Sequence, residues 1–93
     1  MGMAKKLILH GRVQGVFCRA FCAHYARKHR IRGTASNLSD GTVRVLLDTN
    51  DPDLTGRYVC DIRSNPEGYA FYGRIDSVNV ENHDGPLTGE YSF

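Results

Sequence analysis

Arg19 follows a short segment that has the composition of an anion-binding loop. Glycines at positions 11 and 15 flank this segment, and the sequence from Phe17 onward has the composition of a helix. A glycine-containing turn that leads into a helix exposes backbone N–H groups at the positive end of the helix dipole. The Arg19 guanidinium adds a cationic fork that suits a phosphate or a carboxylate. The segment therefore predicts either an anion site or a plain strand-to-helix loop with a surface arginine.

The cysteines do not form the pattern of a disulfide framework. The chain contains Cys18, Cys22 and Cys60, and an odd number does not fit a set of paired bridges. Cys18 and Cys22 are four residues apart, on one face of the expected helix, where they could act as reactive thiols or metal ligands. No clear set of Cys or His completes four zinc ligands, so we interpret both as small buried side chains. Cys18 is the cysteine that could instead be a reactive thiol, because it lies at a helix start beside an arginine.

The composition is that of a small globular protein. The 93 residues are 41% hydrophobic and 24% charged, which suits one domain spanning residues 1–93. The net charge of +2 is too small to indicate nucleic acid by itself. No apolar run approaches the roughly 20 residues of a membrane span, and the N-terminal residues do not resemble a signal peptide. We therefore expect a cytoplasmic monomer that binds neither nucleic acid nor a membrane.

The first half of the chain predicts a strand, a helix and a β-hairpin. Residues 5–12 contain a central apolar run typical of a strand, and residues 17–30 lack proline and glycine, as expected for a helix. Residues 31–37 and 42–48 predict two strands, the second with alternating apolar residues. Residues 39–41, Ser-Asp-Gly, have the composition of a turn. The two strands should therefore form a hairpin.

The second half predicts one more helix and two strands. Residues 50–53, Asn-Asp-Pro-Asp, suit a helix start, because a capping side chain precedes proline. Asn65-Pro66 suits the end of that helix. The apolar residues within 69–81 do not alternate strictly, so the strand there should contain a bulge or a twisted edge. Residues 88–93 predict a last short strand.

The resulting order is strand, helix, strand, strand, helix, strand, with a short extra strand. This order suits an α+β fold, a ferredoxin-like two-layer sandwich whose antiparallel sheet carries both helices on one face. Such a fold hosts enzymes, ligand-sensing modules and RNA binders, so it does not determine function.

A basic cluster near the end of the first helix leaves a non-enzymatic interpretation open. Basic residues that could serve an RNA-binding or ligand-sensing module are Arg27, Lys28, Arg30 and Arg32, and the aromatic residues Phe71 and Tyr72 follow later. An RNA-binding sheet of this type places aromatic residues on its central strands for base stacking. Residues 5–12 contain no aromatic residue, which disfavours this alternative.

Two stretches of the sequence resemble the signatures of the acylphosphatase family. Residues 11–16, Gly-Arg-Val-Gln-Gly-Val, followed by Arg19, resemble the first signature. Residues 33–37, Gly-Thr-Ala-Ser-Asn, followed by Asp40-Gly41 and an apolar strand, resemble the second. The separation between Arg19 and Asn37 is also similar to that in the family. Two motifs at the expected separation are a stronger signal than either motif alone.

The resemblance implies an activity and a set of site residues. It implies hydrolysis of the carboxyl–phosphate anhydride of small acyl phosphates, such as acetyl phosphate, to carboxylate and inorganic phosphate. Arg19 then binds the phosphate, and Asn37 orients the attacking water. The backbone N–H groups that complete the cradle belong to Gln14, Gly15, Val16, Phe17 and Cys18. The resemblance implies no metal, no cofactor and no covalent phosphoenzyme.

Elementary chemistry is compatible with these roles. An acyl phosphate already carries a good leaving group, so the catalyst needs to hold the phosphoryl oxygens and aim a water. Backbone donors and Arg19 supply positive potential where charge sits in the transition state, and an asparagine amide can fix the approach of a water. Without the first motif, Asn37 would be interpreted as a turn residue before Asp40-Gly41.

The order of Phe17 and Cys18 departs from the family pattern. Members of the family usually have an aromatic residue directly before the arginine and a small residue before that, whereas here the two types are exchanged. We expect the exchange to turn the aromatic ring out of the core and to place a thiol beside the phosphate site. The main alternative function is therefore a catalytically impaired domain that binds phosphate or another ligand.

Overall fold

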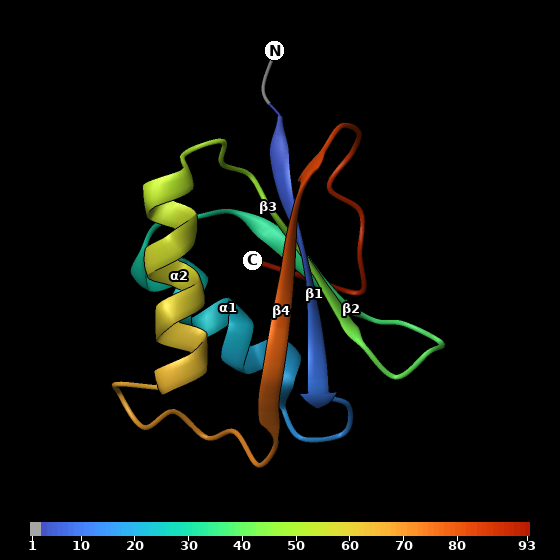
Figure 1. Cartoon of the computed structure of the whole chain (residues 1–93), viewed down its shortest axis with the longest axis vertical. Coiled ribbons are helices and arrows are strands. Elements are labelled where there is room, and N and C mark those ends of the chain that lie inside the picture. Colours follow the sequence, from blue (N-terminus) through green and yellow to red (C-terminus); the bar gives the residue numbers. More distant parts are fainter. Residues whose placement is uncertain (1–2) are drawn as a thin grey trace.

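The computed structural model describes residues 3–93, which form five strands and two helices. In chain order the elements are β1 (Ala4–Arg12), α1 (Cys18–Lys28), β2 (Gly33–Asn37), β3 (Val43–Leu47), α2 (Pro52–Ser64), β4 (Arg74–His83) and β5 (Tyr91–Ser92). The strands form one antiparallel sheet in the order β4-β1-β3-β2-β5. Both helices lie on the same side of this sheet (Figure 1). The predicted ferredoxin-like sandwich is confirmed, with β5 as the short extra strand.

The core lies between the sheet and the two helices. Leu7 and Leu9 of β1 pair across the sheet with Val45 and Val43 of β3, and all four side chains are fully buried. From the helix layer, the fully buried aromatic side chains are Phe21, Tyr25 and Tyr58. The alternation predicted for β3 therefore places its valines on the face that the helices cover. None of the described helices is long and apolar enough to cross a membrane.

Helix α1 is shorter than predicted at both ends. It ends at Lys28 because Arg30 adopts a left-handed conformation, with φ of 57°. The N–H of Arg30 then bonds to the carbonyl of Arg27 at 3.0 Å, and the N–H of Ile31 bonds to the carbonyl of Ala26 at 2.8 Å. These two hydrogen bonds form a Schellman motif, which normally uses glycine. Here an arginine takes that position, so the sequence prediction extended the helix too far.

The hairpin between β2 and β3 is confirmed, with strands shorter than predicted. The N–H of Leu38 bonds to the carbonyl of Thr42 at 2.9 Å, which closes the hairpin next to the last residue of β2. At the tip, Asp40 accepts hydrogen bonds from the hydroxyl and the N–H of Thr42. These two bonds lower the pKa of Asp40.

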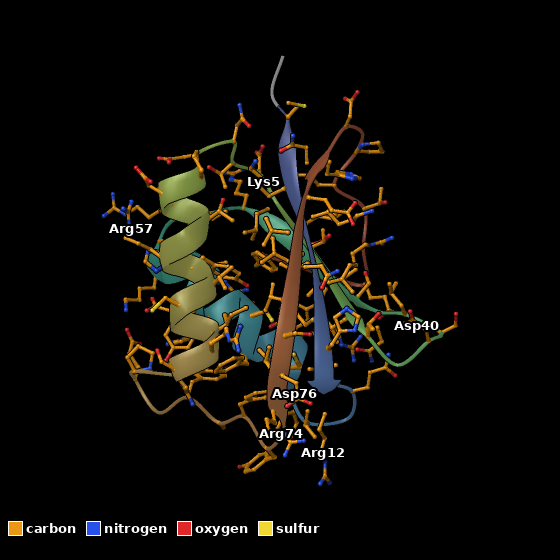
Figure 2. The ribbon with its side chains drawn as sticks, in the orientation of Figure 1. Lys5, Arg12, Asp40, Arg57, Arg74 and Asp76 are labelled. Carbon is orange, nitrogen blue, oxygen red and sulfur yellow. The ribbon has the colours of Figure 1, made fainter. Side chains whose placement is uncertain are left out.

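Strand β4 starts later than predicted and contains a bulge. Residues 69–73 form a loop in which the Phe71 ring stacks on Phe21, with centroids 4.3 Å apart. The pairing of β4 with β1 shifts between His10 and Gly11, so Asp76 has no direct partner. The bulge suggested by the irregular apolar pattern is therefore present. Figure 2 shows Arg74 and Asp76 at this end of the sheet, where their side chains form an ion pair.

The segment between β4 and β5 covers part of the sheet face that lies away from the helices. Residues 84–90, drawn in red, run beside the sheet on the side opposite α2 (Figure 1). The Thr34 hydroxyl donates to the carbonyl of Thr88 at 3.2 Å, and the N–H of Glu90 donates to the Ser36 hydroxyl at 2.9 Å. The segment thus leads the chain to β5 and places Glu90 next to the end of β2.

Candidate active site

A cavity of about 320 Å³ lies where the loop after β1, the start of α1 and the end of β2 meet. Its lining residues are Val13, Gly15, Phe17, Cys18, Arg19, Ala20, Asn37 and Tyr91. The two sequence motifs, which are separated along the chain, therefore contribute to one cavity. Antiparallel pairing of β1 and β2 with β3 brings them together.

The loop before α1 is shaped by two residues in the left-handed conformation. Gly15 has φ of 71° and Phe17 has φ of 65°. Phe17 is also the N-cap of α1, and no side-chain hydrogen bond caps this helix end. The N–H groups of the first helical turn have no intrahelical acceptors, so they are available to an anion. This arrangement fits the predicted phosphate cradle.

Arg19 and Asn37 both border the cavity. Arg19 lies in the first turn of α1, and its side chain is 41% exposed. Asn37 is the last residue of β2, directly before the hairpin turn. One cationic side chain and one amide residue therefore lie at the same cavity as the positive end of a helix dipole. Such an arrangement can hold a phosphate and orient a small polar molecule beside it.

Gln14 and Val16 belong to the predicted cradle segment but do not line the cavity. The Gln14 side chain donates from Nε2 to the carbonyls of Leu38 at 2.7 Å and Thr42 at 2.9 Å. It thus joins the cradle loop to the β2–β3 hairpin that carries Asn37. This linking role was missed from the sequence, because glutamine spacing alone does not identify a partner 24 residues away.

Phe17 and Cys18 lie on opposite sides of the chain. The Phe17 ring is turned out, with 64% of the residue exposed, whereas Cys18 is 3% exposed. Cys18 borders the cavity, but its Sγ lies 3.9 Å from the Sγ of Cys22, within hydrogen-bonding distance, and both side chains are buried. The hydrogen bond with Cys18 and burial raise the pKa of the Cys22 thiol well above its usual value. The interpretation of both cysteines as small buried side chains is confirmed.

Glu90 is a residue at the site that sequence analysis did not identify. Its carboxylate forms an ion pair with Arg19 at 3.1 Å and accepts a hydrogen bond from the N–H of Asn37 at 2.9 Å. Glu90 is 53 residues from Asn37 along the chain, and only the path of residues 84–90 brings them together. No local motif could have indicated this contact.

One residue of the basic cluster near the end of α1, Lys28, forms ion pairs with α2 and the loop after it. Lys28 pairs with Asp61 at 3.1 Å and with Glu67 at 3.5 Å, and His29 bonds to Asp61 at 2.7 Å. His29 is thus packed against a carboxylate. Phe71, which an RNA-binding interpretation would need as a stacking surface, packs instead against Phe21.

Comparison with known proteins identifies the family. The acylphosphatase family model matches residues 5–91, which include every residue that lines the cavity. The chain belongs to the acylphosphatase family. An acylphosphatase of Corynebacterium glutamicum is 38% identical over 73 residues, covering 75% of this chain and 73% of the relative. An acylphosphatase of Azorhizobium caulinodans is 44% identical over 75 residues, covering 81% of this chain and 78% of the relative.

Solved acylphosphatase structures share the fold of this chain. The crystal structure of acylphosphatase from Bacillus subtilis superposes with a TM-score of 0.73 at 21% identity, covering 96% of this chain and 93% of that one. An acylphosphatase from Coxiella burnetii gives a TM-score of 0.70 at 22% identity, with 88% and 81% covered. The structures therefore agree with the fold, while the family model and the curated relatives confirm the family resemblance predicted from two short motifs.

Proposed function

We propose that the protein hydrolyses the carboxyl–phosphate anhydride of small acyl phosphates, such as acetyl phosphate, by direct attack of water on phosphorus. The products are a carboxylate and inorganic phosphate. The observation that carries the proposal is that Arg19, Asn37 and the uncapped start of α1 all border the same cavity. Membership of the acylphosphatase family supports it.

In this proposal the phosphoryl group binds at the start of α1. Its oxygens accept hydrogen bonds from the Arg19 guanidinium and from backbone N–H groups within residues 14–18, of which Gly15, Phe17 and Cys18 line the cavity. A guanidinium holds phosphate oxygens with charge-assisted bonds, and the helix dipole adds a favourable potential. Because these donors are in place before the substrate binds, they stabilise charge in the transition state without reorganisation.

The Asn37 side chain positions the attacking water in this proposal. An amide accepts and donates hydrogen bonds but is not a base at neutral pH, so it contributes orientation rather than proton abstraction. The paired end of β2 and the Gln14 side chain hold the surroundings of Asn37, which supports this role. The leaving carboxylate is stable enough to depart without a strong general acid.

Two substitutions test the separate roles of Arg19 and Asn37. In Arg19→Ala we expect loss of acetyl phosphate turnover and an affinity for inorganic phosphate, measured as competitive inhibition, about tenfold to a hundredfold weaker, equivalent to roughly 1.5–3 kcal/mol. Asn37→Ala should lower kcat while leaving phosphate affinity near that of the wild type. Arg57→Ala is the matched control, because Arg57 lies on the exposed side of α2 (Figure 2).

Two results would contradict these assignments. If Asn37→Ala weakens phosphate binding as much as Arg19→Ala, Asn37 is a phosphate ligand and not a water-positioning residue. If the folded wild type binds phosphate but releases none from acetyl phosphate or benzoyl phosphate, the hydrolase proposal is wrong. The protein would then be better described as a phosphate-binding domain with an impaired cradle. The first variant to make would exchange Phe17 and Cys18, which restores the order usual in the family.

We also propose that the protein acts as a monomer in the cytoplasm and binds neither nucleic acid nor a membrane. The net charge of +2 does not favour nucleic acid. Light scattering measures the oligomeric state, and cell fractionation measures the location. Salt-dependent binding of single-stranded RNA would contradict this part of the proposal.

A further inference from the structure

Glu90 lies between the two residues proposed to act on the substrate. Its Oε1 accepts a hydrogen bond from Nη1 of Arg19 at 3.1 Å and another from the backbone N–H of Asn37 at 2.9 Å. One carboxylate oxygen therefore joins a side chain at the start of α1 to the end of β2. The carboxylate contacts both sequence motifs of the cavity without belonging to either.

The backbone that carries Glu90 is held closely against β2. The N–H of Glu90 donates to the Ser36 hydroxyl at 2.9 Å, and the next residue, Tyr91, pairs with Ala35. At Gly89, a Cβ atom would lie 2.6 Å from the Thr34 hydroxyl and 2.7 Å from that of Ser36. Only glycine permits this close approach. The position of the Glu90 side chain is thus set by the fold on one side of the cavity.

Stability does not account for this contact. The side chains of Arg19 and Glu90 are 41% and 52% exposed, and an exposed ion pair contributes little to stability. A carboxylate beside a phosphate site also repels an anionic substrate, which weakens binding. An arginine side chain, in contrast, has many accessible rotamers, and this conformational entropy must be lost when it binds. Holding it in one orientation before the substrate arrives favours reaction, since small misplacements are costly.

We propose that Glu90 is a positioning residue, which holds the Arg19 guanidinium at the cavity and fixes its placement relative to Asn37. This inference rests on the proposed roles of Arg19 and Asn37. Glu90 occupies one N–H of the guanidinium, and the fork keeps further donors for phosphate oxygens. The residue acts through its two partners and takes no part in bond making or breaking.

Kinetics of Glu90 variants test the proposal. In Glu90→Ala we expect kcat for acetyl phosphate to fall about tenfold or more, because Arg19 loses its fixed orientation. Glu90→Gln keeps an oxygen that accepts both hydrogen bonds but removes the charge. It should therefore retain kcat within about threefold and show a lower KM, because repulsion of the anionic substrate is removed.

Glu81→Ala is the matched control. Glu81 is another exposed glutamate in an ion pair, 57% exposed and 3.5 Å from Lys6, on β4. The Glu81→Ala variant should have the same kcat and KM as the wild type. Thermal unfolding of both alanine variants should stay within a few degrees of the wild type, as expected for exposed pairs. A kcat of Glu90→Ala within twofold of the wild type would overturn the positioning role. A higher kcat/KM in that variant would show that Glu90 obstructs the site.

A measurement without substrate separates this inference from the proposed function. In ¹⁵N relaxation spectra, the Arg19 side-chain Nε–H signal should report a more ordered group in the wild type than in Glu90→Ala. The Asn37 amide signal should shift in the same variant. If Arg19 is equally mobile in both proteins, Glu90 does not hold it, whatever the activity. If the order changes but the wild type has no turnover, the tether exists and the hydrolase proposal fails.

Discussion

Phe17 adopts a backbone conformation that suits glycine better than a side chain. Its φ is 65°, and its ring is largely exposed, with an edge-to-face contact to Tyr72 at a centroid distance of 5.6 Å. For residues other than glycine, the left-handed region costs roughly 1–2 kcal/mol. This conformation turns the ring to solvent, directs the Cys18 thiol into the core and aligns Arg19 with the cavity. The strain therefore lies within the proposed cradle, at a kind of position where backbone outliers often have a function.

Substitution of Phe17 measures this strain. Phe17→Gly should be more stable than Phe17→Ala by about 1 kcal/mol in urea unfolding, because both variants lack the ring and only glycine relieves the positive φ. The alanine variant is thus the control for loss of the contact with Tyr72. Equal unfolding midpoints for the two variants would show that the left-handed conformation is not strained.

Residues close in sequence define both ends of helix α2, but one residue in its interior lowers the stability of the helix. The Asp51 carboxylate accepts hydrogen bonds from the N–H groups of Asp53 and Leu54, and Pro52 takes the first helical position. Asn65 ends the helix in the left-handed conformation. Gly56 lies within the helix, where a Cβ would meet no atom within 4 Å. Glycine at this position therefore costs helix stability without serving a close contact.

Gly56→Ala should stabilise the protein. We expect the free energy of unfolding to rise by about 0.5–1 kcal/mol, because alanine loses less backbone entropy and fits the open space. Gly33→Ala is the opposing control, since a Cβ there would collide with the carbonyl oxygen of Leu46. Chemical denaturation should give a higher free energy of unfolding for Gly56→Ala and a lower one for Gly33→Ala than for the wild type. A Gly56→Ala protein that is less stable than the wild type would contradict this account of α2.

At the scale of the whole molecule, carboxylates join the two helices on the outer side of the sandwich. Burial of Asp61 opposes its ionisation, but hydrogen bonds from His29 and Lys28 outweigh this effect and lower its pKa. Glu67, in the loop after α2, has a lowered pKa chiefly because of its hydrogen bond with His24. These groups connect α1 to α2 and to the following loop, so their protonation weakens the helix layer as a unit.

This arrangement predicts a loss of stability in acid. A carboxyl group whose pKa is lower in the folded state stabilises the fold above its unfolded pKa of about 3.9, and this contribution is lost as the pH falls through the folded value. Urea unfolding should therefore give a lower free energy at pH 3 than at pH 6. Asp61→Asn should lose less stability than the wild type over this interval, because it lacks the carboxylate whose pKa is lowered in the folded state. A wild type equally stable at both values would refute the prediction.

Much of the fold was predictable, because local chemistry determines where most elements lie. Asp51 and Pro52 start α2, and the apolar alternation of β3 selects its buried face. The predicted bounds of helices and strands were wrong where a residue adopts an unusual backbone conformation, as at Arg30, or where side-chain packing takes the place of strand pairing. Phe71 belongs to an apolar stretch that could have continued β4, but stacking on Phe21 holds it in a loop.

The sequence alone determined the family, the order of elements and the proposed roles of Arg19 and Asn37, because two short motifs and strong local signals carry that information. Tertiary structure decided how the cavity is supported. The Gln14 bonds to the hairpin and the Glu90 contact with Arg19 and Asn37 join residues far apart in the chain. Such contacts depend on strand order and on the path of residues 84–90, which spacing along the sequence does not encode.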